Sequence, residues 1–280
     1  MKSRLIVAAV GVPLVLLVII VLPKIAMAIL LAAMCALAVH ELLWTTGLLR
    51  HARIVLYTML LAAFIPIWDY CGAPQFAMLC ALTLFLLAVF AELLAAYRAL
   101  KIESIAMALM AGIMVPMMLS SLVRLMLLEH GRIYACAPFV VAFVADGGAY
   151  FAGRFFGKHK LAPIVSPKKT VEGAIGGILG CVLLGEICTY VYQNIADKSD
   201  IFFHGVAPAF YLVVAVLGVI AAVLGILGDL FASVVKRQHG IKDYGTIFPG
   251  HGGILDRFDS VLFVSLFVCM TVRYAFYFAA

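Results

Sequence analysis

The sequence has few charged residues. Asp, Glu, Lys and Arg make up only 12% of its 280 residues, against about 25% in soluble globular domains. Apolar residues reach 66%, which excludes both a soluble globular protein and a disordered chain. The composition predicts an all-α, polytopic integral membrane protein, and no nucleic-acid partner is expected.

Paired cysteines and repeats are also absent from the sequence. Its seven Cys form no CxxC and lie mainly in apolar runs, so neither a disulfide framework nor a zinc site is expected. An inverted repeat, which is typical of many transporters, is not found either.

Nine apolar stretches can be placed, each near the roughly 20 residues that a membrane-spanning helix needs. About five of these spans fall in residues 1–130, and the rest fall in residues 131–280 with two polar loops, 155–170 and 232–258. The stretches are 5–22, 25–44, 54–70, 75–95, 104–123, 134–154, 171–192, 208–231 and 259–278.

Most of the 20 Lys and Arg lie at the N-terminus or in the connections after the even-numbered spans. The positive-inside rule then predicts a cytoplasmic N-terminus and places both polar loops in the cytoplasm. These two loops carry most of the asymmetry. The first apolar run is longer than a typical signal-peptide core, so a retained first helix is expected.

The densest group of ionisable residues lies between Gly228 and Ser260. Asp229, Ser233, Lys236 and Arg237 recur at helical spacing, which predicts that they share one face. A snorkelling Lys-Arg pair with Asp229 as its partner is the simpler structural interpretation.

The segment after this face adds an anion-binding pattern. The glycines of 249–253 allow backbone N–H groups to approach an anion, and Asp256, Arg257 and Asp259 follow. Either Asp could merely cap the next helix. Carboxylates combined with cations favour a site for Mg²⁺ and a polyphosphate, however.

A second group begins at Asp146, for which Arg154 could be the partner two helical turns on. In the loop that follows, Pro167 is expected to fix a turn and Thr170 to cap the next helix, while Lys168 and Lys169 supply cations for a phosphate. Binding of anionic lipid head groups is the alternative interpretation of this basic loop.

Several other features are expected to be structural. Glu41, Glu92 and Glu186 are interpreted as helix-end or interhelical hydrogen-bonding groups. Glycines at small-xxx-small spacing predict close helix packing. These are Gly173, Gly176, Gly177 and Gly180, with Gly225 and Gly228 as a second set.

Three motifs resemble the phosphatidate cytidylyltransferases (CDP-diacylglycerol synthases), and together they cover roughly residues 140–260. The longest is S-x2-KR-x4-KD-x-G-x3-PGHGGI-x-DRFD over 233–259, and the others are SPKKT-x-EG over 166–173 and D-x2-AY-x2-GR over 146–154.

This resemblance implies that CTP and phosphatidate react to CDP-diacylglycerol and pyrophosphate. It also implies Mg²⁺, a monovalent cation such as K⁺, a homodimer, and a bacterial inner-membrane enzyme with its active site facing the cytoplasm. The implied catalytic residues are Asp229, Lys236, Arg237, Lys242, His251, Asp256, Arg257 and Asp259. The implied substrate-binding residues are Asp146, Ser166, Lys168, Lys169, Thr170, Ser233, Gly252 and Gly253, with the metal on Asp229 and Asp256.

Two positions depart from the pattern of that family. Ala232 stands where Glu is frequent, and Gly147 stands where Ser or Thr is usual. Two other functions stay open at this point. One is a cytidylyltransferase or kinase that acts on another lipid phosphate or a polyprenol, and the other is an ion-coupled transporter.

Overall fold

The computed structural model describes residues 11, 13–195, 208–245, 247 and 252–279, and these residues are overwhelmingly helical. The all-α prediction is therefore confirmed. The helices are α2 (Lys24–His40), π-helix η1 (Glu41–Thr45), α3 (Ala52–Cys71), α4 (Gln75–Ala95), α5 (Ile102–Leu119), α6 (Ser121–Leu127), α7 (Gly131–Phe156), α8 (Val171–Ile195), α9 (Pro208–Gln238) and α10 (Leu255–Ala279).

Among the described residues, seven helical segments are long and apolar enough to cross a membrane. They correspond to the second through eighth predicted spans, and α10 occupies the position of the ninth. The chain is therefore a multi-pass membrane protein. Residues 5–10 and 12 of the first predicted span, 5–22, lie outside the described residues, so the count of nine stays a prediction.

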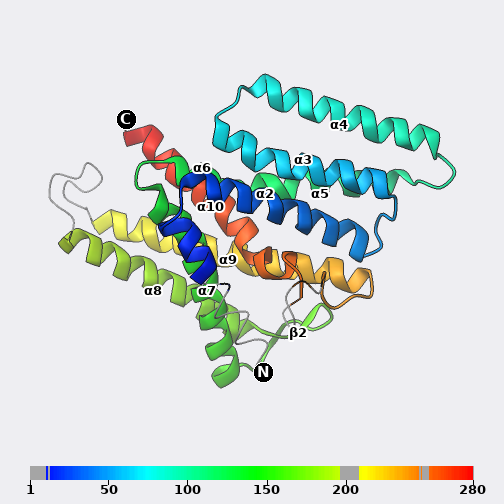
Figure 1. Cartoon of the computed structure of the whole chain (residues 1–280). Coiled ribbons are helices and arrows are strands. Elements are labelled where there is room, and N and C mark those ends of the chain that lie inside the picture. Colours follow the sequence, from blue (N-terminus) through cyan, green and yellow to red (C-terminus); the bar gives the residue numbers. More distant parts are fainter. Residues whose placement is uncertain (1–10, 12, 196–207, 246, 248–251, 280) are drawn as a thin grey trace.

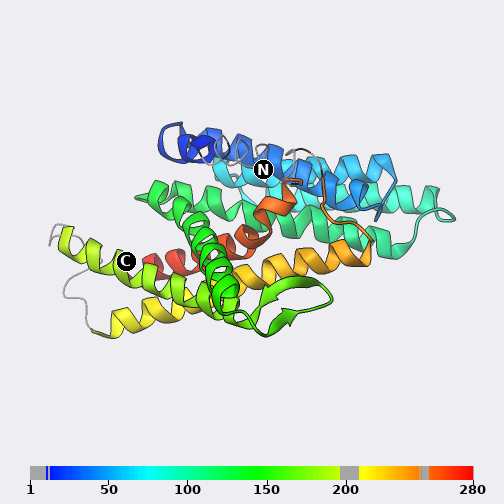
Figure 2. The same ribbon diagram turned by 90° about the horizontal axis from the view of Figure 1, so that it is seen from below.

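Helix α10 lies between two groups of helices (Figures 1 and 2). It packs against α5 and α6 of the first group and against α7 and α9 of the second. The first group holds most of the buried apolar core, which includes side chains of α2, α3, α5 and α6. The polar start of α10 is thus surrounded by elements from both halves of the chain.

The loop between α7 and α8 is a short antiparallel hairpin of β1 (Lys160–Ala162) and β2 (Ser166–Thr170). The turn lies at residues 163–165, and Pro167 lies within β2. The expectation that Pro167 fixes the turn is therefore wrong. A two-stranded hairpin tolerates this proline because both of its strands are edge strands.

The glycines of α8 lie against α7, as their spacing predicts. An added Cβ at Gly177 would lie 2.6 Å from the carbonyl oxygen of Ala145, and one at Gly173 would lie 2.8 Å from that of Ala149. The backbones of α7 and α8 approach this closely only because these positions have no side chain. Their contact holds α7, with Asp146, beside the hairpin that precedes α8.

We predict that Gly177→Ala lowers the free energy of unfolding by about 1–3 kcal/mol, because the new methyl group overlaps a backbone carbonyl that cannot rotate away. The check is the apparent melting temperature of the purified protein in detergent. Gly147→Ala on α7 is the matched control, because a Cβ there meets nothing within 4 Å. Equal melting temperatures for the two variants would contradict the packing argument.

Candidate active site

The crossing of α9 and α10 brings Asp229 and Asp259 together. At Gly228 an added Cβ would lie 2.5 Å from the carbonyl oxygen of Asp259, so α9 touches the backbone of α10 at this point. Asp229 is the next residue on α9. The second predicted glycine set therefore also marks a close helix contact, and it places Asp229 beside the first turns of α10.

Asp229 is bonded but still accessible. Ser233, one turn along α9, donates its hydroxyl proton to Asp229 Oδ1 at 3.3 Å, which confirms that the two residues share a face. The Nζ of Lys169, from strand β2, lies 2.6 Å from Asp229 Oδ2. The Asp229 side chain remains 30% exposed, so an ion or a phosphate can reach it.

Two further carboxylates interact electrostatically with Asp229. They are Asp146 of α7 and Asp259 of α10, and Asp146 also interacts with Lys169 and Arg257. Three helices and the hairpin thus contribute charges to one region.

Arg154 is not part of this group. It donates to the hydroxyl of Tyr150 at 2.8 Å, and among the described residues no ion pair joins it to Asp146. The pairing of Asp146 with Arg154 that helical spacing allowed is therefore wrong. Asp146 instead lies exposed near the carboxylate of Asp229.

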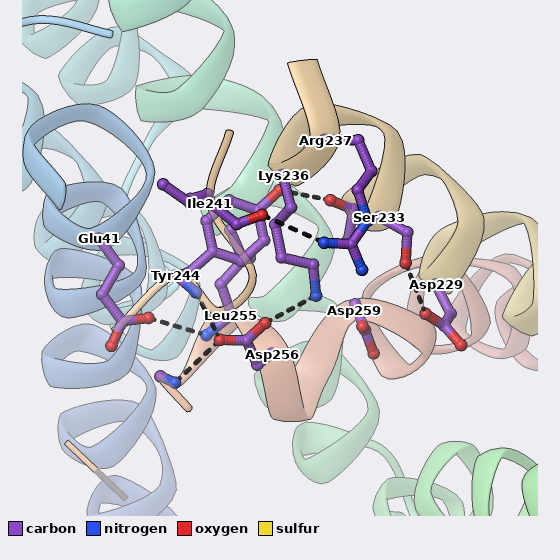
Figure 3. A network of polar contacts seen from close by, with 12 residues as sticks. Glu41, Asp229, Ser233, Lys236, Arg237, Ile241, Tyr244, Leu255, Asp256 and Asp259 are labelled. Atoms are coloured by element: carbon purple, nitrogen blue, oxygen red, sulfur yellow. Dashed lines mark hydrogen bonds and ion pairs between the residues drawn. The ribbon is translucent and has the colours of Figure 1, made fainter. Parts of the chain in front are cut away.

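Asp256 has a different environment, since its side chain is only 2% exposed. Lys236 Nζ lies 2.7 Å from Asp256 Oδ1, while the backbone N–H groups of Tyr244 and Gly253 donate to Oδ2 at 2.7 and 2.9 Å. Figure 3 shows these contacts, with Asp229 pointing toward Ser233 instead. In this arrangement Asp256 fixes the loop between α9 and α10.

Lys236 is buried together with Asp256. Its ammonium group lies 5.3 Å from the centre of the Tyr244 ring, and the Tyr244 hydroxyl donates to the carbonyl oxygen of Ala232 at 2.9 Å. Burial raises the pKa of the Tyr244 phenol, so this donor stays protonated. Sequence reasoning predicted a phosphate contact for Lys236, whereas here its charge is neutralised by Asp256.

Glu41 is the residue that sequence reasoning weighted too little. It is 2% exposed, and its two carboxylate oxygens accept the backbone N–H groups of Ile254 and Leu255, each at 3.0 Å. The interpretation of Glu41 as an interhelical hydrogen-bonding group is confirmed. Its partner is the start of α10 in the longest motif, and nothing in the sequence spacing links positions 213 residues apart.

The hairpin motif contributes both structural and accessible groups. Thr170 accepts the N–H of Gly173 on its hydroxyl at 3.1 Å, which confirms its predicted role as a helix cap. Ser166 is partly exposed and Lys168 is exposed. Arg237 of α9 donates to the carbonyl oxygen of Val165 at 3.3 Å and so ties the hairpin turn to α9.

The remaining predicted site residues fall into three classes. Lys242 and Arg257 are exposed. Gly252 has a φ of +85°, and an added Cβ would lie 2.5 Å from Asp256 Oδ2, so both its backbone and its neighbour require glycine. His251 lies outside the described residues.

The donor set around Asp229 suits a hard divalent cation. Mg²⁺ is typically held by one or two carboxylates together with substrate phosphates, and Asp229 offers an accessible carboxylate near two others. Among the described residues, no group of three or more His, Cys, Asp or Glu side chains is arranged as a complete metal site. Substrate oxygens would therefore have to complete the coordination.

The two departures from the family pattern have simple structural settings. Ala232 is 5% exposed and belongs to the apolar core, so its side chain points away from solvent. A Cβ at Gly147 would meet nothing within 4 Å. Neither position disturbs the contacts of Asp229.

Comparison with known proteins identifies the family of the chain. The sequence model of the cytidylyltransferase family matches residues 2–275. A phosphatidate cytidylyltransferase of Bacillus subtilis is 43% identical over 140 residues, which are 50% of this chain and 47% of the relative. The corresponding proteins of Staphylococcus epidermidis and Haemophilus influenzae are 45% identical over 136 residues and 40% identical over 134 residues.

These matches cover 49% and 47% of this chain and 47% and 43% of the two relatives. The chain thus spans about half the length of the curated relatives it matches. The family match extends over nearly the whole sequence, and the chain belongs to the cytidylyltransferase family.

Proposed function

We propose that the protein transfers the cytidylyl group of CTP to phosphatidate, forming CDP-diacylglycerol and pyrophosphate. The observation that carries this proposal concerns the accessible carboxylate of Asp229 on α9. Three charged residues from three other segments interact with it, namely Asp146, Asp259 and Lys169. The names of the matched relatives supply the substrates. A site of mixed charge on a membrane-spanning scaffold suits a reaction between a nucleotide and a lipid phosphate.

The reaction needs no covalent intermediate with the enzyme. A phosphate oxygen of phosphatidate attacks the α-phosphorus of CTP, the bond from that phosphorus to the bridging oxygen breaks, and pyrophosphate leaves with the electron pair. The protein then contributes positioning and charge neutralisation, as in other phosphoryl-type transfers.

Asp229 is proposed as the main protein ligand of Mg²⁺. The bound ion would neutralise charge that develops on the departing pyrophosphate. Asp256, the second predicted ligand, can add a bond only through Oδ1, which it would share with Lys236, because both N–H bonds occupy Oδ2. Asp259 and Asp146 add negative charge that favours a cation beside Asp229.

The basic side chains have two proposed roles: some neutralise substrate phosphates directly, and Lys169 also neutralises Asp229. Arg237, Lys242, Arg257 and Lys168 are exposed and are proposed to neutralise phosphates. Lys169 neutralises Asp229 in the described arrangement. A cation held by Asp229 would leave the ammonium group of Lys169 available for a phosphate.

The remaining proposed roles follow from the family resemblance. Ser166 and Thr170 are proposed to shape the phosphate site next to Lys168. His251, Gly252 and Gly253 are proposed to line it, although the N–H of Gly253 already donates to Asp256. A bound K⁺, a homodimer, and an active site on the cytoplasmic face of a bacterial inner membrane also belong to this proposal.

We predict that Asp229→Asn lowers turnover about 100-fold or more, because a neutral amide binds Mg²⁺ and balances the phosphate-site cations poorly. The measurement is the Mg²⁺-dependent formation of a lipid-soluble cytidine product from labelled CTP and phosphatidate by the purified protein.

Glu103→Gln is the matched control, because it neutralises an exposed carboxylate in the first turn of α5 and should leave turnover within twofold of the unmodified protein. No product from the unmodified protein with phosphatidate would contradict the proposed function, and product from another lipid phosphate would reassign the acceptor. An active Asp229→Asn protein would contradict the role of Asp229.

The buried pair of Lys236 and Asp256 generates a separate prediction about stability. Asp256→Asn should lower the free energy of unfolding by about 3–5 kcal/mol, because it leaves the ammonium group of Lys236 buried without its counter-charge. The double variant Asp256→Asn with Lys236→Met should recover part of that loss. Thermal unfolding in detergent checks both, with the exposed Lys242→Met as the control. Additive losses in the double variant would contradict the buried pair.

A further inference from the structure

We propose that Glu41 is a positioning residue of the active site, through which the N-terminal half of the chain fixes the start of α10. This inference rests on the proposed function, because it concerns the same site. The hydrogen bonds of Glu41 are with the loop before α10 and the first residue of that helix, and not with Asp229. Glu41 acts through the backbone of Ile254 and Leu255, directly before Asp256.

The Glu41 carboxylate lies at the N-terminal end of α10. The first N–H groups of a helix have no partner within the helix, and the carboxylate of Glu41 accepts those of Ile254 and Leu255 at 3.0 Å each. A negative charge is also favoured at the positive end of the helix dipole. A residue of η1 thus caps α10, where a local Ser, Thr, Asp or Asn would ordinarily do so.

Two glycines lie directly beside the Glu41 carboxylate. An added Cβ at Gly245 would lie 2.5 Å from Glu41 Oε1, and a Cβ at Gly253 would lie even closer to Oε2. Both glycines belong to the longest motif. Their φ angles are not positive, so space for the carboxylate, rather than a special backbone conformation, requires glycine at these two positions.

Backbone N–H groups compensate the burial of the Glu41 carboxylate. Among the described residues, no Lys or Arg lies within 4 Å of the Glu41 carboxylate, so its hydrogen bonds come from backbone N–H groups alone. A buried carboxylate without a cation is costly unless it is fully hydrogen-bonded. An apolar residue or Gln would pack here without that cost if the position only filled space. The carboxyl group at position 41 therefore serves to hold the N–H groups of Ile254 and Leu255.

The N–H groups that Glu41 holds lie next to Asp256 and the loop before it. Glu41 holds residues 254 and 255, while Asp256 holds the N–H groups of Tyr244 and Gly253. The two acids together fix the loop and the direction in which α10 leaves it. Asp259, near the start of α10, interacts electrostatically with Asp229, and Arg257 of the first turn interacts with Asp146. Both positions depend on that direction.

The test compares Glu41→Gln with Glu92→Gln. Glu92 is a matched control because it also ends a helix in the N-terminal half, and its contacts are with His51, Arg53 and Tyr57 rather than with α10. For Glu41→Gln, kcat with CTP and phosphatidate should fall about 10–100-fold, as is usual when a group that orients a ligand residue is lost. KM for CTP should change less than about threefold. Glu92→Gln should leave both unchanged.

Hydrogen–deuterium exchange supplies a readout that needs neither metal nor turnover. In Glu41→Gln the peptide that contains Ile254 and Leu255 should exchange at least tenfold faster, whereas in Glu92→Gln its rate should not change. Unchanged exchange and unchanged kcat in Glu41→Gln would overturn the inference. If the unmodified protein makes no product, the proposed function fails, while the exchange result still tests the contact.

A double-mutant cycle covers the case in which Glu41→Gln folds poorly. Gly245→Ala alone should lower kcat, because the methyl group displaces the carboxylate. In the background of Glu41→Ala the same change should have no additional effect, since the atoms that it would meet are gone. Independent effects of the two substitutions would overturn the role of Glu41.

Discussion

Two buried carboxylates hold the polar start of α10, and the geometry of the site depends on them. Glu41 and Asp256 together accept four backbone N–H groups, and Asp256 also binds Lys236. Each N–H group would be expensive to leave unpaired at such depth. Because one acid comes from η1 and the other from α10, the loop is fixed only when both halves of the chain are packed.

This arrangement divides the acidic residues by task. The side chain of Asp256 is 2% exposed and holds structure, whereas that of Asp229 is 30% exposed and lies beside Asp146 and Asp259. The proposed site for a charged nucleotide would need accessible ligands whose surroundings do not move. The buried pair supplies the rigidity, and the carboxylates near the crossing of α9 and α10 are available for chemistry.

The sequence predicts more of the fold than of the site. Hydropathy locates the described spans, and glycine spacing identifies the close contacts at Gly177 and Gly228 because both follow from local periodicity. Helical spacing places Ser233 beside Asp229 for the same reason. The cap by Glu41 could not be predicted, since it joins distant segments through backbone groups that carry no residue signature. Spacing also gave Arg154 a wrong partner, because the Tyr150 hydroxyl lies only one helical turn from Arg154, whereas Asp146 lies two turns away.

The different roles of Asp229 and Asp256 are tested most directly by the position of the metal in a crystal of the protein with CTP and Mn²⁺. Anomalous scattering locates the Mn²⁺. We expect Mn²⁺ to be bound to an oxygen of Asp229, with the N–H groups of Tyr244 and Gly253 still bonded to Asp256. Mn²⁺ away from Asp229, or bound to an Asp256 side chain that has left those N–H groups, would contradict these roles.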